Sequence, residues 1–157
     1  PVITGWYSEF TALAGQRRAG LVAYGQGADR FAGATYDPTS HYRAAKVFDF
    51  FEGLSLTPTL LREVSQHQIT VLAREFDALD ADPRVITRDR NTPLTQVGGF
   101  LALTAPDAGS LCRALHARDV MTDSRGDVLR LGPAPYLTDQ QLVQAIQALG
   151  EVLSARG

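Results

Sequence analysis

The sequence predicts an α+β fold in which helices pack on one face of a small antiparallel or mixed sheet. Two long segments carry apolar residues at helical spacing, and short apolar runs typical of strands follow them. A capped amphipathic segment then closes the chain. The length of 157 residues suits one good hydrophobic core. We expect an irregular segment at residues 1–36 and the α+β domain at residues 37–157.

Residues 1–36 are expected to form a long irregular loop segment. Glycines recur along it. The longest stretch with a helical or strand-like pattern of apolar residues is the four-residue run at 21–24. Trp6, Tyr7 and Phe10 are large enough to pack against something, which need not belong to this chain. We therefore expect this segment to line an interface.

Two helices are predicted next. The first spans residues 37–52, with Asp37 as its N-cap and Pro38 at its first position. Apolar side chains cover most of its circumference, which predicts a helix buried on several sides. The second spans residues 57–80 and begins at a Thr-Pro pair. Its apolar residues lie on one face, Gln68 among them, and its other face is charged.

Shorter elements follow Asp82 and Pro83. We expect, in order, a strand at residues 84–87, a central strand at 97–104, a short helix at 106–115, a brief strand at 120–122, a tight turn at 124–127 and a last strand from 128. Thr138 and Gln141 have the spacing of a capping box, which predicts a final helix. This order of elements indicates the α+β class.

Arg130 lies in the middle of the last predicted strand and is a candidate binding residue. Gly132, Pro133 and Pro135 end that strand before the capped helix, so regular structure holds the guanidinium. Its planar fork of donors matches the two oxygens of a carboxylate. Strand arginines are also commonly solvated or paired with a neighbouring acid. Both interpretations of Arg130 stay open at this point.

The charge pattern disfavours nucleic acid and membrane partners. The net charge is −2, and the basic residues are scattered among acids. There is no apolar run of membrane-spanning length and no basic-then-apolar leader. We therefore expect a cytoplasmic protein that binds neither nucleic acid nor membranes.

Cysteine and histidine usage indicates no metal site. Cys112 is the only cysteine, and its apolar helical neighbours favour a buried inert thiol over a nucleophile. His41, His67 and His116 are far apart and lack the spacing of metal ligands. Each is expected to be a surface or cap residue.

Four short segments of the chain occur in an order that is typical of one enzyme family. They read Gly-Trp-Tyr at 5–7, Arg-Phe-Ala-Gly-Ala-Thr at 30–35, Gly-Gly-Phe at 98–100 and Arg-Leu-Gly-Pro-Ala-Pro-Tyr at 130–136. In this order the chain resembles the C-terminal part of a kynureninase and, more broadly, the class V aminotransferases, which are pyridoxal-phosphate enzymes of fold type I. The resemblance spans essentially the whole chain. It implies the small domain of such an enzyme, acting on an α-amino acid.

The resemblance also implies roles for single residues. Arg130 matches the arginine that binds the substrate α-carboxylate. Trp6 matches a tryptophan that reaches the cofactor phosphate across the interface of a homodimer. The family often has Gly-Thr-Pro-Pro or Asn-Pro-Pro where residues 33–36 read Gly-Ala-Thr-Tyr. The polar cofactor contact of the partner subunit therefore falls on Ala34, and Thr35 replaces it only with a register shift.

The matched region lacks the chemistry of the cofactor. In this family, the lysine that forms a Schiff base with pyridoxal phosphate precedes the matched region, as do the other main cofactor contacts. Lys46 is the only lysine, and we expect its stem to lie along the core. The chain is therefore predicted to be a piece of an enzyme that lacks its N-terminal large domain and is inactive alone.

Several functions of the parent stay open. A kynureninase would cleave the Cβ–Cγ bond of kynurenine hydrolytically, giving anthranilate and alanine. A class V aminotransferase, a lyase or a desulfurase-like enzyme is the alternative, although Cys112 in a helix is unlike the mobile-loop cysteine of a desulfurase. A non-catalytic dimerisation or binding module is a second class. A tautomerase-like enzyme with Pro1 as its amine base is a third.

Overall fold

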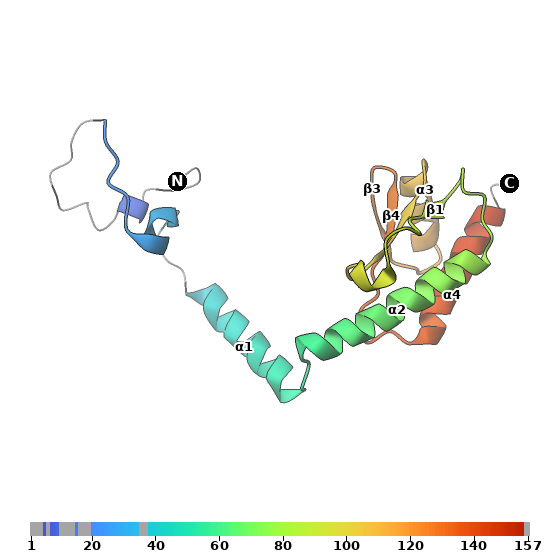
Figure 1. Cartoon of the computed structure of the whole chain (residues 1–157), viewed down its shortest axis with the longest axis horizontal. Helices are drawn as coiled ribbons and strands as arrows, with labels where there is room; N and C mark the ends of the chain where they lie inside the picture. The colour runs from blue at the N-terminus through green and yellow to red at the C-terminus, as the bar shows by residue number, and fades with distance from the viewer. Residues whose placement is uncertain (1–4, 6, 10–14, 16–19, 35–37, 156–157) are drawn as a thin grey trace. The chain divides into compact units, whose positions relative to one another are not determined.

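The computed structural model describes residues 5, 7–9, 15, 20–34 and 38–155 (Figure 1). The chain divides into two compact units, residues 1–54 and residues 55–157, which we describe separately. The predicted boundary between residues 36 and 37 lies outside the described residues.

Backbone contacts hold the described loop residues of the N-terminal unit. The hydroxyl of Ser8 donates a 2.6 Å hydrogen bond to the carbonyl oxygen of Gly5. The carbonyl oxygen of Ser8 accepts a 2.7 Å bond from the amide of Gly25. A Cβ atom at Gly5 would overlap the carbonyl of Gly33, so only glycine permits this approach of the two backbones. The 3₁₀ helix η2 (Gly27–Phe31) lies between these contacts in sequence.

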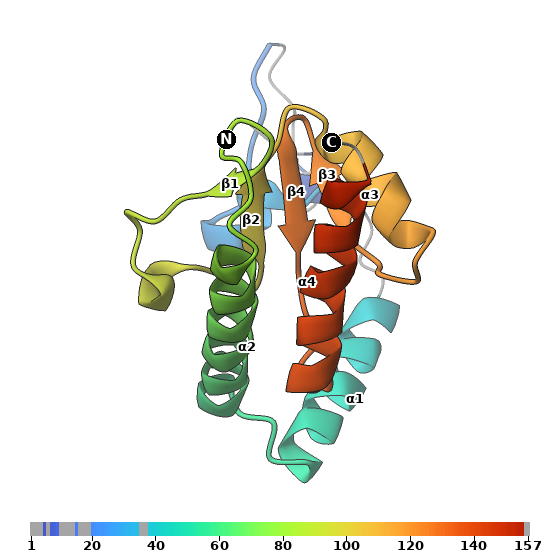
Figure 2. The same ribbon diagram turned by 90° about the vertical axis from the view of Figure 1, so that its right-hand side faces the viewer.

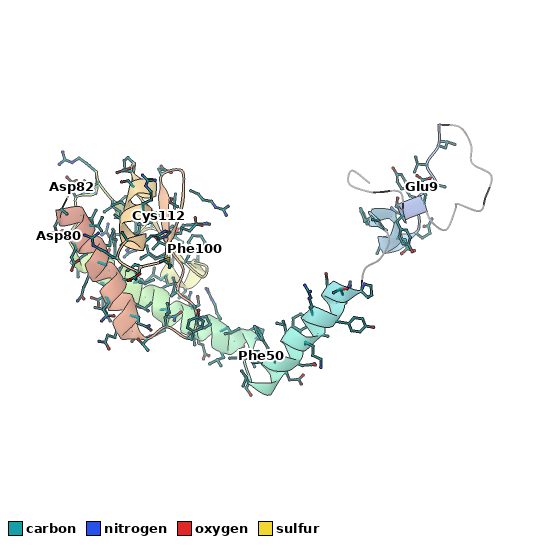
Figure 3. The ribbon with its side chains drawn as sticks, turned by 180° about the vertical axis from the view of Figure 1, so that it is seen from behind. Glu9, Phe50, Asp80, Asp82, Phe100 and Cys112 are labelled. Atoms are coloured by element: carbon teal, nitrogen blue, oxygen red, sulfur yellow. The ribbon has the colours of Figure 1, made fainter. Side chains whose placement is uncertain are left out.

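Helix α1 (Thr39–Gly53) follows in the same unit, and its environment differs from the prediction. The sequence predicts a helix buried on several sides, but no residue of α1 is buried by the described part of the chain. The side chains of Tyr42 and Phe48 are 73% and 68% exposed, and Phe50 is also exposed (Figure 3). Apolar side chains around a helix indicate that something covers it, and no described residue of its own unit does so.

The C-terminal unit contains a four-stranded sheet and three α-helices. Its elements are α2 (Pro58–Ala78), β1 (Thr87–Arg88), the 3₁₀ helix η3 (Leu94–Gln96), β2 (Leu101–Thr104), α3 (Ala108–His116), β3 (Asp123–Arg125), β4 (Val128–Leu131) and α4 (Asp139–Ser154). The strand order is β1-β2-β4-β3, and every neighbouring pair is antiparallel. The predicted α+β class and the predicted order of elements are confirmed.

Helices α2, α3 and α4 pack on one face of this sheet, and α2 and α4 lie side by side (Figure 2). Burial alternates along β2, where Leu101 and Leu103 face the core and the residues between and after them are exposed. Leu129 of β4 is fully buried on the same side. The opposite face of the sheet carries Arg130 and no helix among the described residues of this unit. Arg130 therefore lies on an open sheet face, and the hydrophobic core packs on the opposite face of the same strand.

The helix caps follow the sequence signals where the structure describes them. The hydroxyl of Thr57 accepts a 3.1 Å bond from a backbone amide of the first turn of α2. Both halves of the capping box between Thr138 and Gln141 are present at the start of α4. Pro38 is the N-cap of α1 and not its first helical residue, and Asp37 lies outside the described residues.

Three strands begin later than predicted because their first residues bond elsewhere. The amide of Val85 donates to the carbonyl of Asp82 in a turn, so β1 begins only at residue 87. The carbonyl of Val97 accepts a 2.8 Å bond from Arg62 of α2, and the loop continues to residue 100. The amide of Val120 bonds to the end of α3, which delays β3 to residue 123. These residues are as apolar as those of the strands, so their composition alone did not show that they lie in loops and turns.

None of the helices in the described part of the chain combines the length and the apolar character that crossing a bilayer requires.

Candidate functional site

Arg130 is the centre of the candidate site. It lies on the open face of the sheet, opposite Ala102 of β2 on one side and Asp123 of β3 on the other. Its Nη2 atom forms an ion pair with Oδ2 of Asp123, and its guanidinium carbon lies 5.4 Å from the centroid of the Phe100 ring. The arginine therefore has an acidic neighbour and an aromatic wall, two features that hold a guanidinium in one orientation.

One hydrogen-bond donor of Arg130 is unsatisfied among the described residues. Its Nε atom is buried and finds no hydrogen-bond partner among the described residues. A buried donor without a partner is destabilising, because it loses its bonds to water and gains none in return. Such an orphan donor on a candidate binding residue is a signal that a ligand completes the site.

Phe100 is held in place from two sides. Arg62 of α2 donates hydrogen bonds of 2.8 and 2.7 Å to the carbonyls of Val97 and Thr95, which fixes the loop before Phe100. A Cβ atom at Gly132 would lie 3.6 Å from Cβ of Phe100, so the two segments pass close to each other. A pocket of about 400 Å³ lies there, lined by Gly99, Phe100, Met121, Thr122, Asp123, Arg130 and Gly132.

Gln68 positions the segment that follows Arg130. It is buried on α2, and its Nε2 atom donates to the carbonyls of Ala134 at 2.9 Å and Leu137 at 3.2 Å. Two bonds from one buried amide fix the loop that joins β4 to α4. The sequence placed Gln68 on the core face of α2 but did not show its role. The only signal was a polar residue within an apolar stripe.

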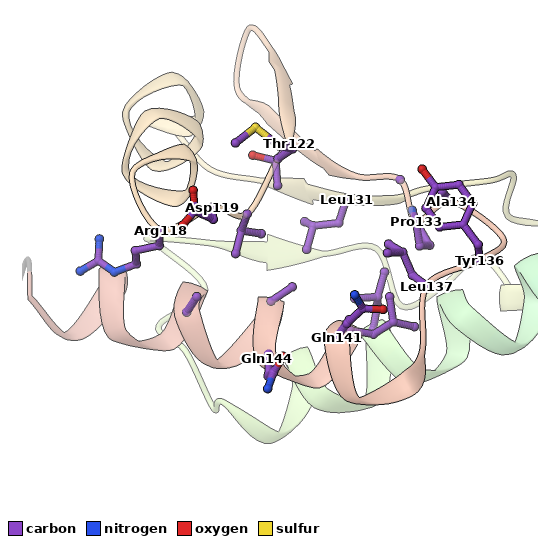
Figure 4. A pocket seen from close by; sticks show the side chains of 17 residues that line it. Arg118, Asp119, Thr122, Leu131, Pro133, Ala134, Tyr136, Leu137, Gln141 and Gln144 are labelled. Carbon is purple, nitrogen blue, oxygen red and sulfur yellow. The ribbon is translucent and has the colours of Figure 1, made fainter.

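A second pocket, of about 630 Å³, lies on the other side of this loop. Figure 4 shows it between the segment at 118–122, the segment at 131–137 and helix α4. Its labelled polar side chains are Arg118, Asp119, Thr122, Gln141 and Gln144. Met121, Thr122 and Gly132 line both pockets, so these residues form the wall between them.

Cys112 is buried on α3, as predicted. Its sulfur lies 3.5 Å from Nε2 of His116, which in turn lies 2.7 Å from the carbonyl oxygen of Thr122. These contacts tie the end of α3 to the wall between the two pockets.

His67 pairs with Asp139 at 2.8 Å. The described residues hold no group of three potential metal ligands.

Of the three residues predicted to contact the cofactor, the structure describes only Ala34. Trp6 and Thr35 lie outside the described residues, as does Pro1. Ala34 is exposed, and its methyl side chain offers no hydrogen bond to a phosphate. The structure therefore leaves the predicted roles of Trp6 and Thr35 as predictions.

Lys46 does not fit a cofactor site. Its side chain is 85% exposed, and its Nζ atom pairs with Asp49 at 3.0 Å. The expectation that its stem lies along the core is wrong, because α1 is not covered by described residues. A Schiff-base lysine is held inside a cofactor site, and an exposed side chain paired with a neighbouring carboxylate lacks those surroundings. The surroundings of Lys46 among the described residues therefore give no support for a Schiff-base role.

Comparisons with known proteins agree with this geometry. The model of the family "Kynureninase C-terminal domain" matches residues 61–149, which include most of α2, the sheet and Arg130. A solved structure titled "NifS-like protein" is similar over 88% of this chain, with a TM-score of 0.58 and 16% sequence identity. This chain covers 41% of that structure. At this identity the similarity shows the fold alone. No curated protein sequence matches the chain.

Proposed function

Because the chain belongs to the kynureninase C-terminal domain family, we propose that it serves as the small domain of a pyridoxal-phosphate enzyme that acts on an α-amino acid. The observation that carries this proposal is the environment of Arg130. The guanidinium is braced by a strand and an aromatic ring, borders a pocket and has a buried Nε without a partner among the described residues. A substrate α-carboxylate supplies what this donor needs.

The cofactor and the reacting atoms belong to the parent enzyme in this proposal. Pyridoxal phosphate, when bound, withdraws electrons from the substrate Cα. The task of this chain is to bind and orient the substrate through Arg130. Gln68 and Arg62 act through the backbone and hold the segments on either side of the guanidinium. This chain alone is then inactive, in keeping with its exposed Lys46.

The specific reaction that we propose is hydrolytic cleavage of kynurenine to anthranilate and alanine. The support is the family of the chain. The experiment is to purify the full-length parent, record its visible absorbance for a bound cofactor and measure anthranilate and alanine after adding kynurenine. Release of both products supports the proposal. A parent without a cofactor band would contradict it.

An aminotransferase or lyase of the same class is the alternative reaction. It shares the carboxylate-binding arginine, so Arg130 does not distinguish the two. A desulfurase-like reaction is disfavoured, because Cys112 is buried and lies in helix α3. The same assay separates the alternatives. A transaminase converts a 2-oxo acid into its amino acid, whereas a hydrolase needs only water.

Helix α1 supports a role for partners of this chain. Its exposed aromatic residues, such as Phe48, form a surface that a soluble domain normally covers. We propose that the large domain of the parent and a second subunit of a homodimer cover it, since the chain spans only 41% of the NifS-like structure. In the parent, Phe48→Asp should lower the yield of soluble dimer in gel filtration. Unchanged dimerisation would place α1 outside the interface.

A non-catalytic dimerisation or binding module is the second candidate function. The same exposed face of α1 favours it. The coding sequence of the parent decides between the candidates. A lysine-bearing large domain supports the enzyme, and its absence supports the module.

A further inference from the structure

Asp123 and Arg130 form a cross-strand ion pair on the open face of the sheet. They are directly opposite each other in the register of β3 and β4. Arg130 is the less exposed partner, with 24% of its side chain accessible against 57% for Asp123. Asp123 is therefore the more accessible member of the pair.

The atom that Asp123 occupies is decisive. A guanidinium offers a carboxylate two pairs of parallel donors, Nε with Nη2 and Nη1 with Nη2. Nη2 belongs to both pairs through its two N–H groups, and it is the atom that forms the ion pair with Asp123. The charge and volume of the Asp123 carboxylate at Nη2 thus compete with a bidentate ligand. Asp123 does not satisfy Nε, which has no partner among the residues that the structure describes.

A second cation lies within reach of Asp123. Oδ2 of Asp123 is 4.0 Å from Nε of Arg125, two residues along the same strand and on the same face of the sheet. Asp123 and Arg125 are both exposed, so a rotation of the Asp123 side chain meets no packed core. A carboxylate that leaves Arg130 therefore has an alternative partner.

From these three observations we propose that Asp123 is an internal competitor for the substrate carboxylate. It occupies Arg130 in the absence of ligand and moves to Arg125 when a carboxylate binds Nε and Nη2 together. The proposal rests on the proposed role of Arg130 and adds a specificity residue to it. Ligands that bind through one oxygen gain only what Asp123 already provides, whereas a planar carboxylate also satisfies the buried Nε. Asp123 thereby selects for bidentate ligands.

The test uses the 157-residue chain, labelled with ¹⁵N at arginine, and propionate as the probe. Propionate binding is followed by NMR through the Nε–H signal of Arg130. We expect Asp123→Asn to bind propionate about fivefold more tightly than the unmodified chain, the factor given by loss of one exposed competing ion pair. Asp127→Asn is the matched control. It removes the same charge from the exposed turn of the same hairpin and should change the affinity by less than about twofold.

A double-mutant cycle tests the role of Arg125. Arg125→Gln should weaken propionate binding when Asp123 is present and have a smaller effect in the Asp123→Asn background. Equal effects in both backgrounds would reduce Arg125 to a general electrostatic contribution and overturn the exchange. Equal or weaker binding by Asp123→Asn would also overturn it, because Asp123 would then orient Arg130. Asp123→Ser replaces Asp123→Asn if the amide variant does not fold.

A further variant separates this inference from the proposed function. Arg130→Gln should abolish the saturable propionate binding that the Asp123→Asn chain shows. Retained binding in the double variant would remove the carboxylate role of Arg130 itself. Lost binding together with no gain from Asp123→Asn would overturn the competitor role alone.

Discussion

Nε2 of Gln68 lies 2.9 Å from the carbonyl oxygen of Ala134 and so joins the middle of α2 to the loop that follows Arg130. The same nitrogen donates to Leu137 at 3.2 Å. Replacement of Gln68 by Met keeps the length of the side chain and removes both bonds. Both carbonyls then lose the Gln68 donor, although the carbonyl of Ala134 keeps its 3.0 Å bond from the amide of Leu137. We expect the free energy of unfolding to fall by ~2 kcal/mol. Urea unfolding followed by circular dichroism measures this loss.

The matched control for Gln68 is Gln147→Met on the exposed side of α4. It makes the same chemical change where the amide is in solvent, and it should alter stability by less than about 0.5 kcal/mol. In the parent enzyme, Gln68→Met should also raise KM, because the loop after Arg130 loses its anchor. Similar stability losses at residues 68 and 147 would show that the buried hydrogen bonds contribute little.

Arg130→Lys in the parent is the second prediction. Lysine keeps the charge but cannot donate two parallel bonds, and its flexible stem does not stack on Phe100 as a planar guanidinium does. We expect kcat/KM to fall by a factor that corresponds to ~1–3 kcal/mol. The cofactor absorbance should stay unchanged. Arg74→Lys at an exposed position of α2 is the control, and unchanged kinetics for Arg130→Lys would make Arg130 a structural residue.

The order of elements was predictable because helix caps and apolar periodicity are local signals. The Thr138 capping box and the Thr57 cap are examples, since each depends on residues within one turn. The partner of Arg130 was not predictable in the same way. The sequence suggested a strand at 120–122 and a turn at 124–127, which would leave Asp123 between them and outside the strand. Only the observed register places Asp123 opposite Arg130.

Helix α1 shows a different limit. Its apolar circumference predicted burial, and the described residues leave Phe48 exposed. The apolar side chains of α1 indicate that its surface is buried away from water, but they do not identify the protein segment that covers it. Gln68 shows a third limit, because a polar residue on a core face has many possible partners. Its bonds to Ala134 and Leu137 cross more than 60 residues of sequence, beyond the reach of any local pattern.

Acid sensitivity is the third prediction and concerns Asp77 at the end of α2. The hydrogen bonds from Arg88 lower the pKa of Asp77 below the ordinary aspartate value of about 3.9, and Arg90 adds to this effect. A depressed folded-state pKa stabilises the fold above the unfolded pKa, and this contribution is lost as the pH falls through the folded value. Asp77→Asn should therefore destabilise the chain at about pH 6 and much less at about pH 3.

Urea unfolding at the two pH values measures the effect at Asp77. Glu63→Gln removes one carboxylate from an exposed position of the same helix, and its effect should be small at both pH values. An Asp77→Asn effect that is the same at both values would mean that packing of the side chain, and not its charge, stabilises the fold.

Two glycines of the C-terminal unit lead to the last prediction, with opposite signs for the same substitution. Gly126 forms the turn between β3 and β4 at a φ of +58°, where a Cβ atom is strained even though no other atom is near. Gly126→Ala should lower stability by ~1 kcal/mol. Gly109 lies in α3, where a Cβ atom would meet Nη1 of Arg113 at an ordinary 3.6 Å. Gly109→Ala should raise stability by ~0.5–1 kcal/mol, because alanine favours the helix. An unchanged or raised urea midpoint for Gly126→Ala would contradict the backbone conformation of the hairpin that presents Asp123 to Arg130, and a lowered midpoint for Gly109→Ala would contradict the expected gain in α3.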